Sequence, residues 1–104
     1  MDSNTLLLRI TNAQYKSLQS LNFVIGDKTF ELTPNAQIWP RVLNTAIYGD
    51  QDSIYLSVQD LGPNVPGVDF ICGMTFLERF YSVFDSGNRQ VGLARTAFTN
   101  ATTN

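Results

Sequence analysis

The sequence predicts a mostly β domain with one to three short helices. Short apolar runs recur along the chain, separated by turn signals rich in Gly, Asn, Asp and Pro, which is the pattern of short strands. A length of 104 residues with 43% hydrophobic content suits one small domain. We therefore expect a single domain over residues 1–98 and a polar tail over residues 99–104 that frays.

The first third of the chain contains the signals of a strand, a helix and a hairpin. Residues 6–10 read LLLRI and predict a strand, and residues 12–18 follow a polar cap and predict a short helix. Residues 23–32 read FVIGDKTFEL, in which two β-rich runs flank a turn that contains Gly. This arrangement predicts a β-hairpin.

The middle of the chain is less regular. Residues 36–43 have apolar spacing compatible with a short helix, which Pro40 interrupts. Residues 54–58 read IYLSV and predict a strand. Residues 61–67 read LGPNVPG, and this density of Gly and Pro predicts a surface loop.

The last third predicts a strand, a helical turn and a second hairpin. Residues 68–73 read VDFICG and indicate a strand, and residues 75–80 indicate one or two helical turns. Residues 81–85 and 90–94 flank the turn sequence SGNR and predict a terminal hairpin.

The charge balance excludes several kinds of partner. Lys and Arg number 7 against 9 Asp and Glu, which gives a formal net charge of −2. This balance argues against binding to nucleic acid or to an anionic membrane. The chain has no apolar run near the ~20 residues of a membrane span, and its first residues, MDSN, lack the features of a signal peptide. We therefore expect no nucleic acid partner, no membrane insertion and no signal peptide in this chain.

The scarcity of metal-binding and nucleophilic residues excludes several reaction classes. The chain has no His and a single Cys, Cys72, so the usual zinc sites, the His-dependent triads and an internal disulfide are ruled out. Asp50, Asp52 and Asp60 do not follow the calcium-loop pattern and are expected in solvated loops. We expect no metal site and no cofactor.

Two stretches near the end of the chain carry a family motif. Residues 70–85 read FICGMTFLERFYSVFD, and residues 88–94 read NRQVGLA. Together they resemble the closing segment of pepsin-like aspartic peptidases, which has an apolar-apolar-Gly strand, a short helix with Phe-Leu, Val-Phe-Asp, a turn and Val-Gly-Leu-Ala. The hairpin over residues 23–32 and the sequence TPNAQIWPR after it are similar to the middle of the second lobe in secreted basidiomycete enzymes of the polyporopepsin type. The resemblance covers most of the chain and implies a partial pepsin-like lobe from a secreted fungal parent.

The family's chemistry needs two aspartates that face each other and share a proton, so that one activates water while the other protonates the carbonyl. In the family each lies in an apolar-apolar-Asp-Thr/Ser-Gly loop, and the resemblance implies that this chain begins after the second loop. Asp85 lies in a similar string, VFDSG, but Asn88 stands where Thr or Ser is needed. We therefore expect Asp85 to serve turn hydrogen bonding, the chain to contain no catalytic residue, and the chain not to be an enzyme.

Four further positions are interpreted structurally. The family commonly has Asp at the position of Met74, and Cys72 replaces an apolar or small residue, so Cys72 is expected to be a buried free thiol with no base beside it. Glu78 and Arg79 adjoin on a predicted helix and are expected to face solvent.

Two functions remain open from the sequence. The first is a catalytically incomplete piece of a secreted fungal aspartic peptidase. The second is a stand-alone fungal binding protein, immunomodulatory or lectin-like, with a protein or glycan partner. Unpaired strand edges would favour self-association as a homodimer in either case. One sequon, Asn100-Ala101-Thr102, fits a secreted parent.

Overall fold

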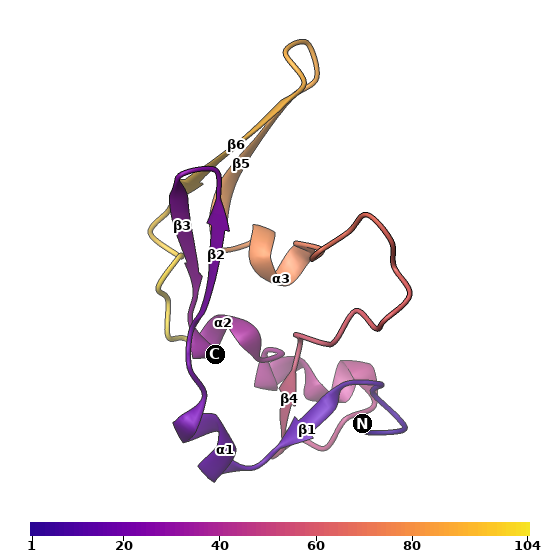
Figure 1. Ribbon diagram of the computed structural model, residues 1–104. Coiled ribbons are helices and arrows are strands. Elements are labelled where there is room, and N and C mark those ends of the chain that lie inside the picture. Colours follow the sequence, from indigo (N-terminus) through magenta and orange to yellow (C-terminus); the bar gives the residue numbers. More distant parts are fainter.

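The computed structural model describes all 104 residues and is mostly β, as expected. In chain order its elements are β1 (Leu8–Ile10), α1 (Asn12–Ser17), β2 (Leu21–Ile25), β3 (Lys28–Leu32), α2 (Pro34–Gln37), the 3-10 helix η1 (Arg41–Ile47), β4 (Ile54–Leu56), α3 (Met74–Leu77), β5 (Phe80–Asp85) and β6 (Gln90–Arg95). The strands form three antiparallel two-stranded sheets, β1–β4, β2–β3 and β5–β6 (Figure 1). None of the helices has the length and apolar character needed to cross a membrane.

Local signals explain the start of the chain. Thr11 Oγ1 accepts a hydrogen bond from the Gln14 N–H at 3.1 Å, and Gln14 Oε1 accepts one from the Thr11 N–H at 2.8 Å. This reciprocal capping box satisfies two backbone donors at the start of α1. The strand predicted in residues 6–10 and the helix predicted in residues 12–18 are confirmed.

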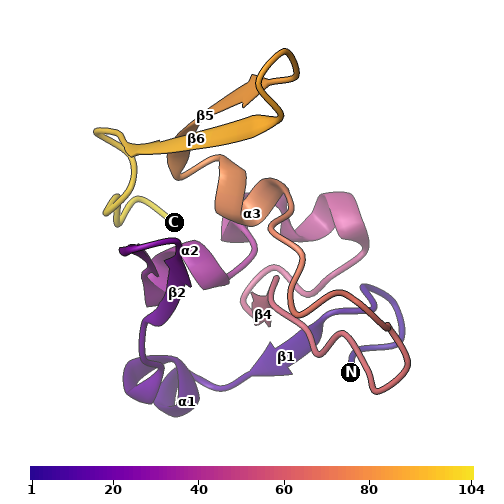
Figure 2. The ribbon, with the colours of Figure 1, turned by 45° about the horizontal axis from the view of Figure 1, so that its top comes forward.

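Both predicted hairpins are also confirmed. In β2–β3, Phe23 lies opposite Phe30, and Gly26 in the turn has φ +65°, a left-handed conformation that glycine adopts without steric cost. In β5–β6, Val83 lies opposite Gly92. The hairpin β5–β6 extends away from the rest of the molecule (Figure 1), and in the view of Figure 2 it lies above α3.

The helix predicted over residues 36–43 is only partly right. Helix α2 ends before Ile38, which forms an isolated antiparallel bridge with Leu56, and η1 begins after Pro40. The bridge requires extended backbone at Ile38, and Pro40 cannot donate the hydrogen bond of a continuous helix. Two short helices therefore replace the single one.

The predicted strand over residues 68–73 is wrong. These residues lie in irregular backbone that leads to α3, and no backbone–backbone hydrogen bond involves any residue from 58 to 72. A strand needs a neighbour for its N–H and C=O groups, and no other stretch of this chain lies in that position. Phe70 and Ile71 are exposed as a result, Ile71 by 69%.

The main apolar cluster joins the hairpin β2–β3 to α2, α3 and β5. Its buried residues are Phe30, Leu32, Ala36, Phe76 and Phe80. The rings of Phe30 and Phe80 meet edge to face with centroids 5.5 Å apart, a favoured aromatic geometry. Aromatic contacts therefore connect elements that are distant in sequence.

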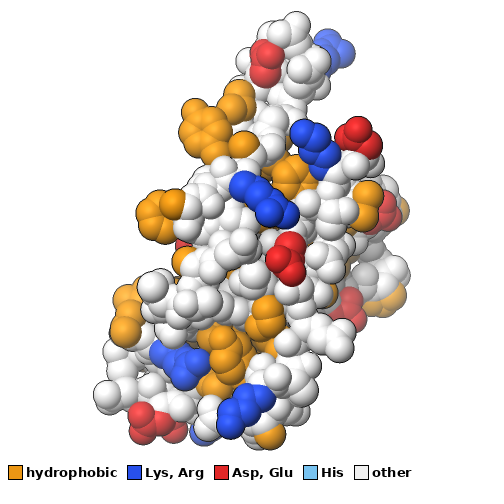
Figure 3. All heavy atoms as spheres, turned by 90° about the vertical axis from the view of Figure 1, so that its left-hand side faces the viewer, with side chains coloured by type: hydrophobic (Ala, Val, Ile, Leu, Met, Phe, Trp, Pro, Cys, Tyr) orange, Lys and Arg blue, Asp and Glu red, His pale blue; other side chains and the backbone are white.

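A second, smaller cluster of Ile10, Ile38 and Ile54 joins β1 to β4 and to the bridge residue after α2. In the whole chain, 15 of 104 residues are buried, so the core is small and many large apolar side chains lie on the surface. Those with more than half their surface exposed include Leu6, Val24, Val42, Ile71, Met74, Phe84, Val91 and Phe98. Hydrophobic side chains form several groups on the face shown in Figure 3.

Arg79 is buried, which corrects the expectation that it faces solvent, whereas Glu78 is exposed as expected. Arg79 Nη1 donates to the carbonyl oxygens of Phe98 at 3.2 Å and Ala101 at 2.8 Å, and Arg79 Nη2 donates to Asn35 Oδ1 at 2.9 Å. A buried guanidinium needs such acceptors, because its charge has lost its water shell. Arg79 thus anchors the chain end to α2.

The tail over residues 99–104 does not fray, contrary to expectation. Thr99 is buried and its hydroxyl donates to the Arg79 carbonyl at 2.5 Å. Asn104 Nδ2 donates to the Ile38 carbonyl at 3.0 Å, and Asn104 Oδ1 accepts from the Arg41 N–H at 3.2 Å. The chain end therefore returns to lie beside α2 (Figure 2).

Candidate functional site

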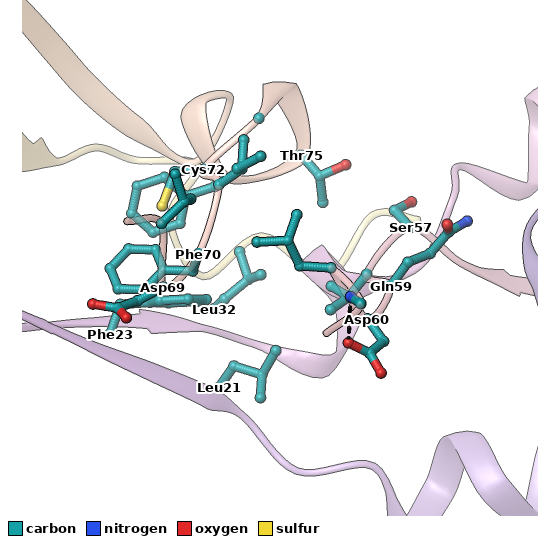
Figure 4. Close-up of a pocket in the computed structure, with 17 residues that line it drawn as sticks. Leu21, Phe23, Leu32, Ser57, Gln59, Asp60, Asp69, Phe70, Cys72 and Thr75 are labelled. Carbon is teal, nitrogen blue, oxygen red and sulfur yellow. Dashed lines mark hydrogen bonds between the residues drawn. The ribbon is translucent and has the colours of Figure 1, made fainter. Parts of the chain in front are cut away.

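A cavity of about 710 Å³ opens between the hairpin β2–β3, the segment after β4 and the segment that leads into α3 (Figure 4). Leu21 and Phe23 of β2 and Leu32 of β3 form one wall, because alternate residues of a strand point to one face. The opposite wall includes Phe70 and Cys72. The cavity is therefore mainly apolar.

Aromatic contacts hold the two walls together. The ring of Phe23 lies 5.2 Å from the ring of Phe70 and 5.5 Å from the ring of Phe76, between centroids. These contacts fix the irregular segment before α3 against the hairpin, although that segment makes no backbone–backbone hydrogen bonds. Side-chain packing is therefore the main contact that shapes this wall.

The polar groups of the cavity do not form a catalytic constellation. Figure 4 shows the carboxylates of Asp60 and Asp69 at opposite ends of the site, with Leu21 and Leu32 between them. Asp60 Oδ1 accepts a hydrogen bond from the Gly62 N–H at 2.8 Å, which holds it in a local turn. Sharing one proton requires carboxyl groups in direct contact. The two carboxylates are therefore not placed to share a proton with each other, and the lining between them is mainly apolar.

Cys72 lines the cavity and is half-buried, so it is less enclosed than the sequence predicted. Burial raises the pKa of the Cys72 thiol, because desolvation penalises the thiolate. A protonated thiol is a poor nucleophile. Cys72 acts here as a small apolar side chain, in agreement with the interpretation that no base activates it.

Asp85 is the last residue of β5, beside the turn that leads into β6. Its Oδ2 accepts from Asn88 Nδ2 at 2.8 Å and its Oδ1 from the Asn88 N–H at 3.2 Å. These hydrogen bonds lower the pKa of Asp85. The resulting stabilisation of the turn is present above the pKa of the unfolded chain and is lost as the pH falls through the folded-state value. The turn role predicted for Asp85 is confirmed.

Comparisons with known proteins decide the family. The family model described as eukaryotic aspartyl protease matches residues 4–96. The chain belongs to the eukaryotic aspartyl protease family. It is 64% identical over 104 residues to polyporopepsin from Irpex lacteus, a match that covers 99% of this chain and 31% of that enzyme. It is 33% identical over 82 residues to cathepsin E from Rattus norvegicus, covering 79% of this chain and 20% of that protein.

A solved structure agrees with this assignment to the aspartyl protease family. The crystal structure of an aspartic proteinase from Irpex lacteus superimposes with a TM-score of 0.92 at 64% identity, covering 99% of this chain and 31% of that one. The resemblance inferred from the sequence and the partial pepsin-like fold are therefore confirmed. The chain spans under a third of the length of the relatives it matches.

The expectation that the chain is not an enzyme is wrong. A relative that is 64% identical across nearly the whole chain is an aspartic proteinase, so the match points to a protease family. The expectation came from counting carboxylates in this stretch alone. A catalytic pair is assembled from positions distant in sequence, and most of the matched enzyme's length lies outside the compared stretch.

Asp50 and Asp52 make local contacts at the surface. Asp50 Oδ2 lies 3.8 Å from Arg9 Nη2 on the surface, and Asp50 Oδ1 accepts from the Asp52 N–H at 2.9 Å. No group of three or more His, Cys, Asp or Glu side chains converges in a way that could hold a metal ion. Asp50, Asp52 and Asp60 lie in exposed turns, as the sequence predicted.

Two buried polar residues that fix loops of this family member were not predicted from the sequence. Arg79 anchors the chain end, and Asn44, only 1% exposed, donates from Nδ2 to the carbonyl oxygens of Asp50 at 3.0 Å and Ser53 at 2.8 Å. Neither has a local sequence signal, because their acceptors are backbone carbonyls and, for Arg79, also Asn35 Oδ1, and the positions of these acceptors depend on the tertiary fold.

Proposed function

We propose that this chain acts in peptide-bond hydrolysis as the closing part of the second lobe of an aspartic endopeptidase. The observation that carries the proposal is the 64% identity to polyporopepsin along 104 residues. In this role the chain supplies the framework of the lobe, and the facing aspartates are supplied by the part of the catalytic domain outside this chain. Secretion belongs to the same proposal, because the family resemblance implies a secreted parent.

The unsatisfied surfaces of the chain support this role. Residues 58–72 have no backbone–backbone hydrogen bonds, and Phe70 and Ile71 present apolar side chains beside the cavity. Backbone groups and apolar surface of this kind gain stability when another strand covers them. The chain therefore has a face that suits packing against the remainder of a larger lobe.

A chimeric enzyme tests the proposal. The 104-residue stretch of polyporopepsin that matches this chain is replaced by this chain, and hydrolysis of casein is measured at acid pH. We expect pepstatin-sensitive activity within about tenfold of the parent enzyme, which corresponds to about 1.4 kcal/mol of activation free energy. The parent enzyme and a version without the stretch are the matched controls.

Two outcomes contradict the proposal. One is a chimera that folds, as judged by circular dichroism, and yet does not hydrolyse casein. The other is a chimera that does not fold, because the chain would then fail to complete the lobe.

A role as a stand-alone binding protein has no specific observation in its favour. Binding of the isolated chain to a glycan array would support that role, whatever the result for the chimera.

Self-association of the isolated chain is a second expected result. With its apolar surface uncovered, the chain is expected to form a homodimer at micromolar concentration, so that light scattering gives a mass near twice 11.6 kDa. Ile71→Lys places a charge on the uncovered face and is expected to shift the mass towards the monomer. Val42→Lys, at a position 90% exposed on η1, is the matched control. A monomeric mass for the unmodified chain would contradict this expectation.

A further inference from the structure

We propose that Asn100 is an acceptor for N-linked glycosylation and that the first sugar of the glycan packs on the ring of Phe98. Residues 98–102 read FTNAT, in which an aromatic residue stands two positions before the Asn of an Asn-x-Thr sequon. Asn100 and Thr102 are exposed, and Phe98 is 68% exposed. The proposal rests on the secretion included in the proposed function, because glycosylation of this type takes place in the secretory pathway.

A turn brings the aromatic ring and the acceptor amide into one short reversal of the chain. The Ala101 N–H donates to the Phe98 carbonyl at 3.1 Å, which closes a β-turn with Phe98 first and Asn100 third. The start of the turn is fixed by the Phe98 N–H, which donates to Thr96 Oγ1 at 3.0 Å. Surface turns of this kind leave the acceptor side chain accessible to a large enzyme.

The residues on either side of Asn100 are held by the buried network of Arg79. Thr99 is buried and bonds the Arg79 carbonyl, and the Ala101 carbonyl accepts from Arg79 Nη1 at 2.8 Å. The backbone of the sequon is therefore held against the body at Thr99 and Ala101, whereas Asn100 between them is exposed and makes no side-chain hydrogen bond. A glycan at Asn100 would disturb no contact of the fold.

The modification is the transfer of an oligosaccharide from a lipid diphosphate carrier to the side-chain amide of Asn100. Asn100 Nδ2 attacks the anomeric carbon of the first N-acetylglucosamine and forms a C–N bond. The bond between that carbon and the diphosphate oxygen breaks, and the lipid diphosphate leaves with the electron pair. The amide nitrogen loses one proton to the transferase. No oxidation or reduction occurs.

Packing on the Phe98 ring would favour one position of the first sugar relative to the chain. One face of an N-acetylglucosamine ring presents C–H groups, which carry partial positive charge and pack well on the negative face of an aromatic ring. In the bare chain the ring of Phe98 is exposed to water. Contact with the sugar would remove apolar surface from water on both partners.

The test is expression of the full chain behind a secretory leader in a glycosylating yeast host. Occupancy of Asn100 is measured by mass spectrometry after peptide-N-glycosidase treatment, which converts a glycosylated Asn to Asp, in both the medium and the cell lysate. We expect a glycan at Asn100 and its complete loss in Asn100→Gln and Thr102→Ala. Gln90→Thr, which makes Asn88 an acceptor in the exposed β5–β6 turn, is the positive control.

The packing on Phe98 is tested by limited chymotrypsin digestion. Cleavage after Phe98 is expected to be slower in the glycosylated chain than in the deglycosylated chain, whereas cleavage after Phe84, which is equally exposed at 69%, is expected to be unchanged. An unmodified Asn100 in a chain glycosylated at Asn88 would overturn the acceptor assignment. Equal cleavage after Phe98 in both forms would overturn the packing. Neither result depends on peptidase activity, so the proposed function is tested separately.

Discussion

Replacing Arg79 with Met is expected to lower the free energy of unfolding by about 2–4 kcal/mol, because three acceptors lose a charge-assisted donor. Those acceptors are Asn35 Oδ1 and the carbonyl oxygens of Phe98 and Ala101. Met keeps much of the apolar stem, so the change isolates the loss of the guanidinium hydrogen bonds. The chain end is expected to detach from α2.

Urea unfolding and amide hydrogen exchange measure these effects of the Arg79 substitution. The exchange of the Thr99 and Ala101 amides, which are hydrogen-bonded within the tail turns, is expected to accelerate more than that of the β2–β3 amides. Arg95→Met on the exposed surface of β6 is the matched control and is expected to change stability by less than about 0.5 kcal/mol. Equal stability of the Arg79 variant and the control would show that the network contributes nothing.

Replacing Phe80 with Ala is expected to have the largest effect, a loss of about 3–5 kcal/mol. Phe80 is 4% exposed, meets Phe30 edge to face and lies 4.7 Å from Phe76 between ring centroids. Its removal leaves a cavity where the hairpin β2–β3, α3 and β5 converge. A loss of this size is comparable to the whole stability of a small domain, so the variant is expected to unfold at low urea concentration.

The control for Phe80 lies on the same strand. Phe84→Ala removes the same atoms from a ring that is 69% exposed, so its cost is expected to stay within about 0.5 kcal/mol. The shift of the urea midpoint at constant slope measures both variants. Similar midpoints for the two variants would mean that the aromatic cluster does not hold the hairpins together.

Elements made by neighbouring residues followed from the sequence. The capping box at Thr11 and Gln14, the Gly26 turn of β2–β3 and the hairpin β5–β6 are all closed by contacts within a few residues. Such contacts depend on backbone geometry and turn chemistry, which the residues themselves specify. The turn role of Asp85 followed for the same reason.

Predictions failed where distant segments decide the outcome. Residues 68–73 have the composition of a strand, but a strand forms only beside a partner, and this chain places none there. Arg79 was expected in solvent because it adjoins Glu78, whereas the returning chain end buries it. The prediction that the chain is not an enzyme failed similarly, because it treated one stretch as if the catalytic pair had to lie within it.

The sequence by itself determined the family, the mostly β character and the position of the hairpins, because motif spacing and local backbone preference are properties of contiguous residues. Only the tertiary structure decided which polar side chains are buried, where the chain end lies and how Phe98 and Asn100 share a turn held by Arg79. These features depend on contacts between residues distant in sequence, and the energy of such contacts is defined only once the chain has folded.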